Sequence, residues 1–160
     1  MGFTEHPRRD LSAGVIESRP TKFSMIKKLI LTRNHWQAMR RHVARRAPLE
    51  ACGLLGGKND KVEIRLGVRN AGRSPVRFRM EARAQWRAFR RIEDRGLELV
   101  GIYHSHPNGP AYPSPTDMAE AMYPVVQVIW WLQEGKWQAR GFWIEGGRVS
   151  EVALQVINPE

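Results

Sequence analysis

Two histidines, a serine and an aspartate lie close together in the middle of the chain. His104 and His106 are followed by Ser114 and Asp117, so the four residues fall within fourteen positions. Imidazole and carboxylate ligands suit zinc, and three protein ligands leave the fourth tetrahedral position for a water molecule. Zinc lowers the pKa of such a water to about 7. This spacing therefore predicts a metal site with an open position, and with it a hydrolase.

The segment before the histidines determines where their side chains point. Residues 97–103 are mostly apolar and predict a strand that delivers His104 and His106 at its end. Side chains two positions apart on a strand project from the same face, so the imidazoles project together while Ser105 points away. Pro107 ends the strand, which predicts imidazoles at the rim of the sheet rather than in the core. A third ligand must come from another segment.

Asp117 is the best candidate for that third ligand, although local rules also offer it a structural role. Residues 114–117 read Ser-Pro-Thr-Asp, a good helix start with serine at the N-cap and an acid three residues later. Taken alone, this pattern favours a capping acid. The two nearby histidines reverse that interpretation, and we predict that Asp117 is a ligand.

The remaining pattern predicts an α+β fold with an α/β/α-like arrangement. We expect a mixed, curved sheet of six to seven strands, flanked by two main helices, with a short helix after the metal loop. Strands are predicted over 26–31, 51–57, 62–68, 97–103, 125–132, 138–144 and 149–156, and helices over 34–46, 81–95 and 115–122. In the second helix, Ala82, Trp86 and Phe89 would form the apolar face. Residues 1–24 predict a flexible N-terminal extension, and residues 25–160 one domain.

The motif resembles that of a known metalloprotease family. His104-x-His106, followed after seven residues by Ser114-x-x-Asp117, resembles the JAMM motif of the JAB1/MPN/Mov34 zinc metalloproteases, also called MPN+. Residues 48–57 resemble the segment that carries the family's upstream glutamate, here Glu50. Residues 101–107 also look like the family's strand, and the resemblance covers roughly residues 26–157.

This resemblance implies a cytidine-deaminase-like MPN fold and a role for each motif residue. His104, His106 and Asp117 would bind one Zn²⁺ per chain. Glu50 would act as general acid/base, taking a proton from the metal-bound water and passing it to the leaving amine. Ser114 would hydrogen-bond the water and stabilise the developing oxyanion.

The family generally hydrolyses peptide or isopeptide bonds beside the C-terminal glycines of ubiquitin-like modifiers or sulfur carriers. The next strand is expected about eight residues after Asp117, which leaves no room for a long insertion and is similar to small stand-alone prokaryotic members. The implied partner is a ubiquitin-like or sulfur-carrier protein, ThiS- or MoaD-like, with a Gly-Gly tail. A non-catalytic MPN scaffold and a DNA-associated protein of RadC type stay open as alternatives.

Arginines on the two main predicted helices carry much of the net charge of +10. They predict either a solvated basic face or a docking surface for an acidic partner. We expect no nucleic-acid partner, because no nucleic-acid-binding signature accompanies the charge. The arginines are Arg40, Arg41, Arg45 and Arg46 on the first helix, and Arg83, Arg87, Arg90, Arg91 and Arg95 on the second.

Two further features bear on compartment and reactivity. Cys52 is the only cysteine, which excludes an intramolecular disulfide, agrees with a reducing compartment and predicts a small buried apolar side chain. No run of eighteen apolar residues is present, so we expect no membrane partner and a cytoplasmic protein. His35 and His42 share one helix face and are expected at surface or boundary positions, not as ligands. The oligomeric state stays open, a homodimer included.

Overall fold

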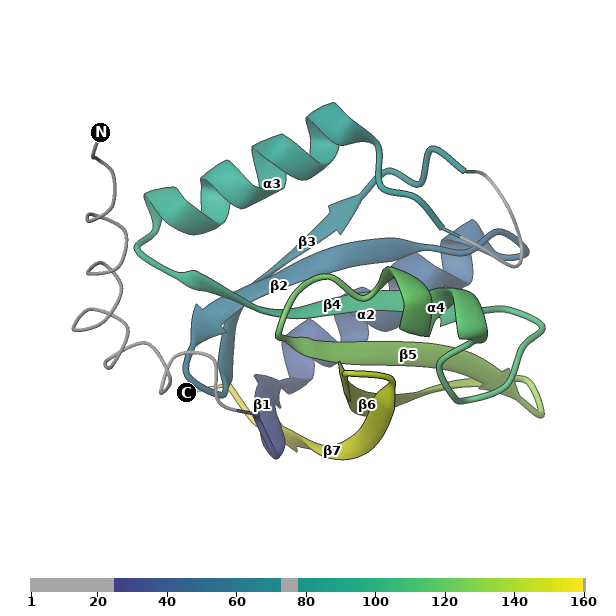
Figure 1. Cartoon of the computed structure of the whole chain (residues 1–160). Coiled ribbons are helices and arrows are strands. Elements are labelled where there is room, and N and C mark those ends of the chain that lie inside the picture. Colours follow the sequence, from purple (N-terminus) through teal and green to yellow (C-terminus); the bar gives the residue numbers. More distant parts are fainter. Residues whose placement is uncertain (1–24, 73–77, 160) are drawn as a thin grey trace, which may run out of the picture.

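The computed structural model of this chain describes residues 25–72 and 78–159 (Figure 1). The predicted extension over residues 1–24 lies outside them. The elements of the described residues are β1 (Lys28–Thr32), α2 (Arg33–Arg46), β2 (Cys52–Lys58), β3 (Lys61–Val68), α3 (Ala82–Asp94), β4 (Glu98–His106), α4 (Pro115–Glu120), β5 (Val126–Gln133), β6 (Lys136–Glu145) and β7 (Arg148–Ile157). None of these helices is long and apolar enough to cross a membrane.

The strands of the described residues form one mixed sheet that closes on itself in the order β1-β3-β2-β4-β5-β6-β7. β4 and β5 pair in parallel, whereas β2 pairs antiparallel with both β3 and β4. β1 closes the ring by pairing in parallel with β7 along its whole length and with β3 at Ile30. The predicted mixed, curved sheet is therefore confirmed, and its curvature continues to closure.

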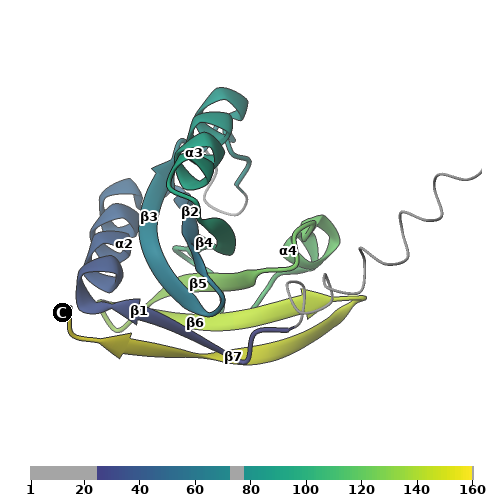
Figure 2. The same cartoon turned by 90° about the vertical axis from the view of Figure 1, so that its left-hand side faces the viewer.

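The two main helices lie on opposite faces of the sheet (Figure 2). Met39 and Val43 of α2 belong to one core cluster together with Tyr103 of β4. Ile92 of α3 belongs to a second cluster together with Ile102, the neighbouring residue of β4. Because successive side chains of a strand point to opposite faces, β4 separates the two clusters. α4 lies on the same side of the sheet as α3 (Figure 2).

Local signals place most of the element ends where the sequence predicts them. Thr32 is the N-cap of α2, because its hydroxyl accepts a hydrogen bond from the His35 amide at 3.2 Å. Asn59 adopts a left-handed conformation, with φ of 57°, in the turn between β2 and β3. Gly96 follows α3 with φ of 70°, where a residue without a Cβ is favoured.

The predicted apolar face of α3 is wrong at two of its three positions. Ala82 is exposed and Trp86 is 60% exposed, while only Phe89 is partly buried. The helix instead turns Ala88 and Ile92 toward the sheet. Gly56 of β2 makes this possible, since a Cβ there would lie 2.9 Å from Cγ1 of Ile92. The indole of Trp86 stays at the surface with the guanidinium of Arg90 5.3 Å from its ring centroid.

Candidate metal centre

Strand β4 brings the two predicted imidazole ligands together. The Nε2 atoms of His104 and His106 lie 3.1 Å apart, and both residues are almost fully buried. β4 ends at His106, directly before Pro107, as predicted, but the expectation that the imidazoles lie at the rim rather than in the core is wrong because both are almost fully buried. β4 continues through His106 with β5 paired beside it to Trp131, and the ring of Phe78 stacks on His104 with centroids 4.6 Å apart.

Asp117 caps α4 and also lies against both imidazoles. Its backbone amide donates to Oγ of Ser114 at 3.0 Å, and its Oδ2 accepts from the Ser114 amide at 2.9 Å. The same Oδ2 lies 3.3 Å from Nε2 of His104 and 3.0 Å from Nε2 of His106. The capping box of α4 thus holds this carboxylate against both imidazoles.

These three atoms have the spacing that a zinc ion requires, and the hydrogen bonding of His106 suits a ligand. Ligand atoms about 2.0–2.1 Å from a tetrahedral ion lie roughly 3.3 Å from one another. Nδ1 of His106 lies 2.9 Å from the carbonyl oxygen of Pro110, which can only accept, so Nδ1 carries the proton. A protonated ring donates from Nε2 to the Asp117 carboxylate, whereas a neutral ring has a lone pair on Nε2 that can bind a cation placed between the two atoms. The donor set therefore fits zinc.

The loop between the histidines and Ser114 is held at two carbonyl groups. Besides the Pro110 carbonyl, which accepts from His106, the carbonyl of Ala111 accepts from Nη1 of Arg140 at 3.2 Å. Arg140 also pairs with Glu151 at 2.7 Å on the neighbouring strand β7. The loop is thereby tied both to the site and to the sheet.

Burial and hydrogen bonding shift the pKa of each candidate ligand. Burial lowers the pKa of His104. For His106, burial also opposes the charged form, but hydrogen bonds with Asp117 and the Pro110 carbonyl outweigh it and raise the pKa. Burial would raise the pKa of Asp117, yet the hydrogen bonds from both imidazoles and from the Ser114 amide hold it well below its usual range. Asp117 is therefore ionised at neutral pH.

Glu50 brings a second carboxylate to the same place. It lies two residues before the start of β2 and is 3% exposed. Its carboxylate lies with the ring nitrogens of His104 and His106 in a group whose atoms are within 4.8 Å of one another. Its Oε1 has no hydrogen-bond partner among the described residues. Burial raises the pKa of Glu50 to about 8, and Asp117 adds to the shift while His106 opposes it. A carboxyl with such a pKa can both take and give a proton near neutrality.

Two buried polar residues that the sequence analysis did not single out hold the segment around Glu50. Oγ of Ser105 accepts from the Ala51 amide at 2.8 Å, while the Ser105 amide donates to the Ala51 carbonyl at 3.0 Å. Nδ2 of Asn70 donates to the carbonyl of Glu50 at 2.8 Å. Oδ1 of Asn70 also accepts from the amides of Gly72 and Arg79. The alternation along β4 predicts that Ser105 points away from the histidines, but no local pattern indicates its partner.

Ser114 and Cys52 are the remaining residues for which the sequence predicts a role. Ser114 is half-buried, and its Oγ serves as the N-cap acceptor of α4. The described residues provide no acceptor for its hydroxyl hydrogen. Cys52 is fully buried with Sγ directed at the Val68 carbonyl, and burial raises the pKa of its thiol to about 12. Its thiolate is therefore disfavoured, in agreement with the predicted apolar role.

A cavity of 490 Å³ opens beside His104 and Asp117. Its lining comes from α3 and the segment before it, from β4 and β5, and from α4 with the residues after it. Most of these side chains are apolar or uncharged, among them Phe78, Met80, Gln85, Ile102, Met122, Tyr123 and Gln127. Such a pocket suits an extended, mostly apolar peptide that ends at the metal centre.

Comparison with known proteins identifies the family. The family described as prokaryotic homologs of the JAB domain matches residues 32–144, a range that contains Glu50, both histidines, Ser114 and Asp117. The chain belongs to this family. A relative from Thermus thermophilus, named a probable TtuB-protein conjugate cleaving protease, is 38% identical over 81% of this chain and 83% of its own. The CysO-cysteine peptidase of Mycobacterium tuberculosis is 33% identical over 81% of this chain and 91% of its own.

Solved structures agree with this assignment of the fold. The solution structure of a protein from Desulfitobacterium hafniense has a TM-score of 0.74 and 32% identity, covering 82% of this chain and 94% of that one. A JAB1/MPN domain protein from Archaeoglobus fulgidus, at 19% identity, has a TM-score of 0.54 and covers 81% of this chain and 99% of its own. The predicted MPN-type fold is confirmed.

Proposed function

We propose that this JAB-family chain is a zinc-dependent peptidase or isopeptidase that acts on a ubiquitin-like or sulfur-carrier protein. It would hydrolyse the bond between the carbonyl of the terminal glycine, in a Gly-Gly tail, and an amine. The observation that carries the proposal is a buried carboxyl oxygen of Glu50, which has no hydrogen-bond partner within residues 25–72 and 78–159 and lies beside the His104–His106–Asp117 group. A buried acid without a partner costs free energy, and a role in proton transfer explains why it is kept there.

His104, His106 and Asp117 would hold the zinc ion, which supplies a Lewis acid and lowers the pKa of a water molecule. Glu50 would take a proton from that water as its oxygen bonds to the glycine carbonyl carbon, and would return the proton to the amine as the carbon–nitrogen bond breaks. Ser114 has a hydroxyl hydrogen free to donate, and we assign to it the stabilisation of the developing oxyanion.

The names of the two relatives support this bond class. One is named a probable TtuB-protein conjugate cleaving protease, and the other a CysO-cysteine peptidase. In this chain the cavity beside His104 and Asp117 would hold the tail, since its lining of apolar side chains suits the residues that precede the glycines.

The proposal is tested with the full-length protein loaded with zinc and a ubiquitin-like protein whose Gly-Gly tail is joined to a reporter through a peptide bond, an isopeptide bond or a cysteine. We expect cleavage directly after the second glycine, loss of cleavage with a chelator, and recovery when zinc is added back. Glu50→Gln should abolish cleavage. Glu63→Gln, which changes an exposed glutamate on β3, is the matched control and should leave the rate unchanged.

Cleavage that survives the chelator or the Glu50→Gln substitution would contradict the mechanism. Zinc bound to the wild-type chain without turnover of any tailed substrate would instead support a non-catalytic scaffold.

Ser114→Ala should lower kcat by about 10²–10³-fold if its hydroxyl stabilises the oxyanion. Ser114→Thr retains a hydroxyl for both the cap and the oxyanion, so it should retain most of the activity.

A further inference from the structure

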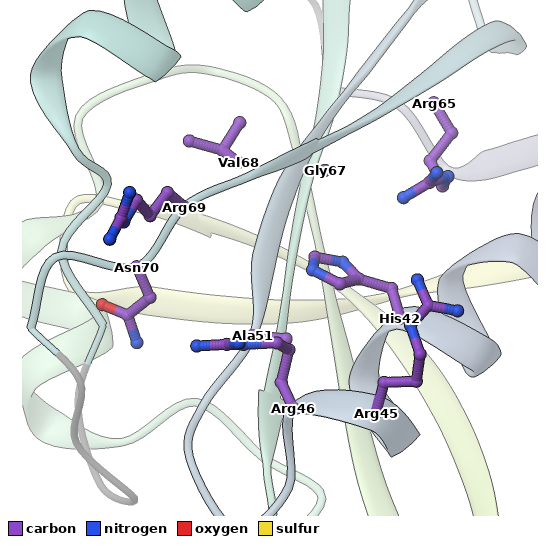
Figure 3. A pocket seen from close by; sticks show the side chains of 9 residues that line it. All are labelled: His42, Arg45, Arg46, Ala51, Arg65, Gly67, Val68, Arg69 and Asn70. Carbon is purple, nitrogen blue, oxygen red and sulfur yellow. The ribbon is translucent and has the colours of Figure 1, made fainter.

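A second cavity lies on the α2 face of the sheet, opposite the face that carries α3 and α4 (Figure 3). It has a volume of 610 Å³ and is lined by α2, by β3 and by the residues that follow β3. Four arginines line it: Arg45, Arg46, Arg65 and Arg69. No carboxylate belongs to this lining, and within residues 25–72 and 78–159 no ion pair joins these guanidinium groups to an acid.

Buried polar contacts fix one side of this cavity. Nη1 of Arg65 donates to the hydroxyl of Tyr103 at 2.8 Å, and that hydroxyl lies 2.6 Å from Nδ1 of His42. Since a guanidinium can only donate, the tyrosine oxygen accepts from it, and the same hydroxyl is hydrogen-bonded to Nδ1 of His42. Burial, followed by the charges of Arg65, Arg45 and Arg46, lowers the pKa of His42 to about 4. The imidazole is therefore neutral at pH 7, and the positive charge of the pocket comes from its arginines.

Gly67 leaves the space above His42 open. A Cβ at this position would lie 3.2 Å from both Nη1 of Arg65 and Cε1 of His42. Figure 3 shows the His42 imidazole reaching from α2 toward Gly67, with Arg65 on β3 beyond it. A larger residue at position 67 would press on both groups, so the concave shape depends on this glycine.

The shape and charge of the cavity define the ligand it suits. Guanidinium groups bind phosphate oxygens through paired, charge-assisted hydrogen bonds. The volume falls within the range of about 300–1,000 Å³ that is typical of small-molecule sites. The positive charge of four guanidinium groups is more than a single carboxylate can neutralise. A concave site also favours a small ligand over the flat surface of an acidic protein. We propose that this cavity binds a small phosphorylated ligand through a diphosphate group.

The arginines of α3 provide a control for non-specific attraction between the net positive charge of the protein and a negatively charged ligand. They lie on the opposite face of the sheet from α2, so the two basic helices do not form one surface (Figure 2). Arg83 and Arg87 are exposed and do not line the cavity. The double substitution Arg83→Ala with Arg87→Ala therefore removes the same charge as Arg46→Ala with Arg69→Ala without touching the site.

The test is calorimetric titration of the zinc-loaded protein with pyrophosphate, with a nucleoside diphosphate and with inorganic phosphate, at constant ionic strength. Because pyrophosphate also chelates metals, zinc content is measured before and after each titration. We expect the two diphosphates to bind more tightly than phosphate. Arg46→Ala with Arg69→Ala should weaken their binding about tenfold or more per lost guanidinium, and Arg83→Ala with Arg87→Ala should leave it within about twofold.

Three results would overturn the proposal. The first is no binding of either diphosphate to the wild-type protein at millimolar concentration. The second is equal weakening by both double substitutions, which would indicate non-specific attraction to net charge. The third is salt-dependent retention of duplex DNA that pyrophosphate does not compete away, which would make this face a nucleic-acid surface instead.

Discussion

Asn70→Ala tests how the backbone around Glu50 is held in place, because it removes a hydrogen bond to the Glu50 carbonyl and leaves the Glu50 carboxyl group unchanged. Asn70 is 5% exposed and makes three hydrogen bonds through its side chain, one of them to the Glu50 carbonyl. Each such bond contributes about 0.5–1.5 kcal/mol net, and a buried group left without a partner costs about 1–3 kcal/mol. Gly72 and Arg79 are exposed, so in the variant water can replace Asn70 as the partner of their amides. Glu50 is buried, so its carbonyl would be left without a partner.

We therefore expect Asn70→Ala to lower the free energy of unfolding by about 2–4 kcal/mol. A domain of ordinary stability, about 5–15 kcal/mol, stays folded after this loss. Because the carbonyl of Glu50 loses its anchor, we also expect kcat to fall while KM changes little. Urea denaturation measures the first effect, and cleavage of a tailed substrate measures the second.

Asn158→Ala is the matched control. Asn158 is exposed and accepts from Arg33 at the surface, so its loss should change the free energy of unfolding by less than about 0.5 kcal/mol and leave kcat unaltered. The reasoning about Asn70 would be refuted if Asn70→Ala unfolds at the wild-type urea concentration. It would also be refuted if the variant loses stability but keeps the wild-type kcat.

Three further substitutions, at Ser105, Gly53 and His42, test the contacts that hold the residues around the site. Ser105→Ala should cost about 1–3 kcal/mol in urea denaturation because the buried Ala51 amide loses its acceptor, and metal analysis should show that zinc is retained. Gly53→Ala should lower the thermal midpoint, since a Cβ there would lie 2.3 Å from Cε2 of Tyr103, and overpacking of this kind costs about 1–3 kcal/mol. His42 has a pKa near 4 in the folded chain and 6.5 as its ordinary value, so the unfolded chain binds more protons between these values. Stability should therefore fall as the pH drops from 6.5 to 4, and His42→Gln should flatten this part of the acid-unfolding curve.

The sequence predicts the arrangement of His104, His106 and Asp117 well because its determinants are local. The alternation of one strand places His104 and His106 together, and the helix start at Ser114 places Asp117. The interpretation of Asp117 as a capping acid is confirmed, and its role as a ligand stays a prediction. One Oδ2 atom accepts the capping hydrogen bond and faces the imidazoles, so the signals for the two roles coincide.

The parts that the sequence did not predict depend on contacts between distant segments. Ser105 meets Ala51, and Asn70 meets Glu50, across intervals that no periodic pattern spans. Closure of the sheet depends on the parallel pairing of β1 with β7, from opposite ends of the domain. The buried face of α3 follows from the close approach that Gly56 allows, rather than from the aromatic residues of the helix.

Zinc content of two carboxylate variants tests the central claim most directly, because both carboxylates lie near the imidazoles. Oδ2 of Asp117 lies 3.0 and 3.3 Å from the two Nε2 atoms, and a carboxylate oxygen of Glu50 lies within 4.8 Å of the ring nitrogens. We predict about one zinc per chain in wild type and in Glu50→Gln, which should be inactive, and little zinc in Asp117→Asn. Retention of zinc by Asp117→Asn together with its loss from Glu50→Gln would make Glu50 the ligand and contradict the account.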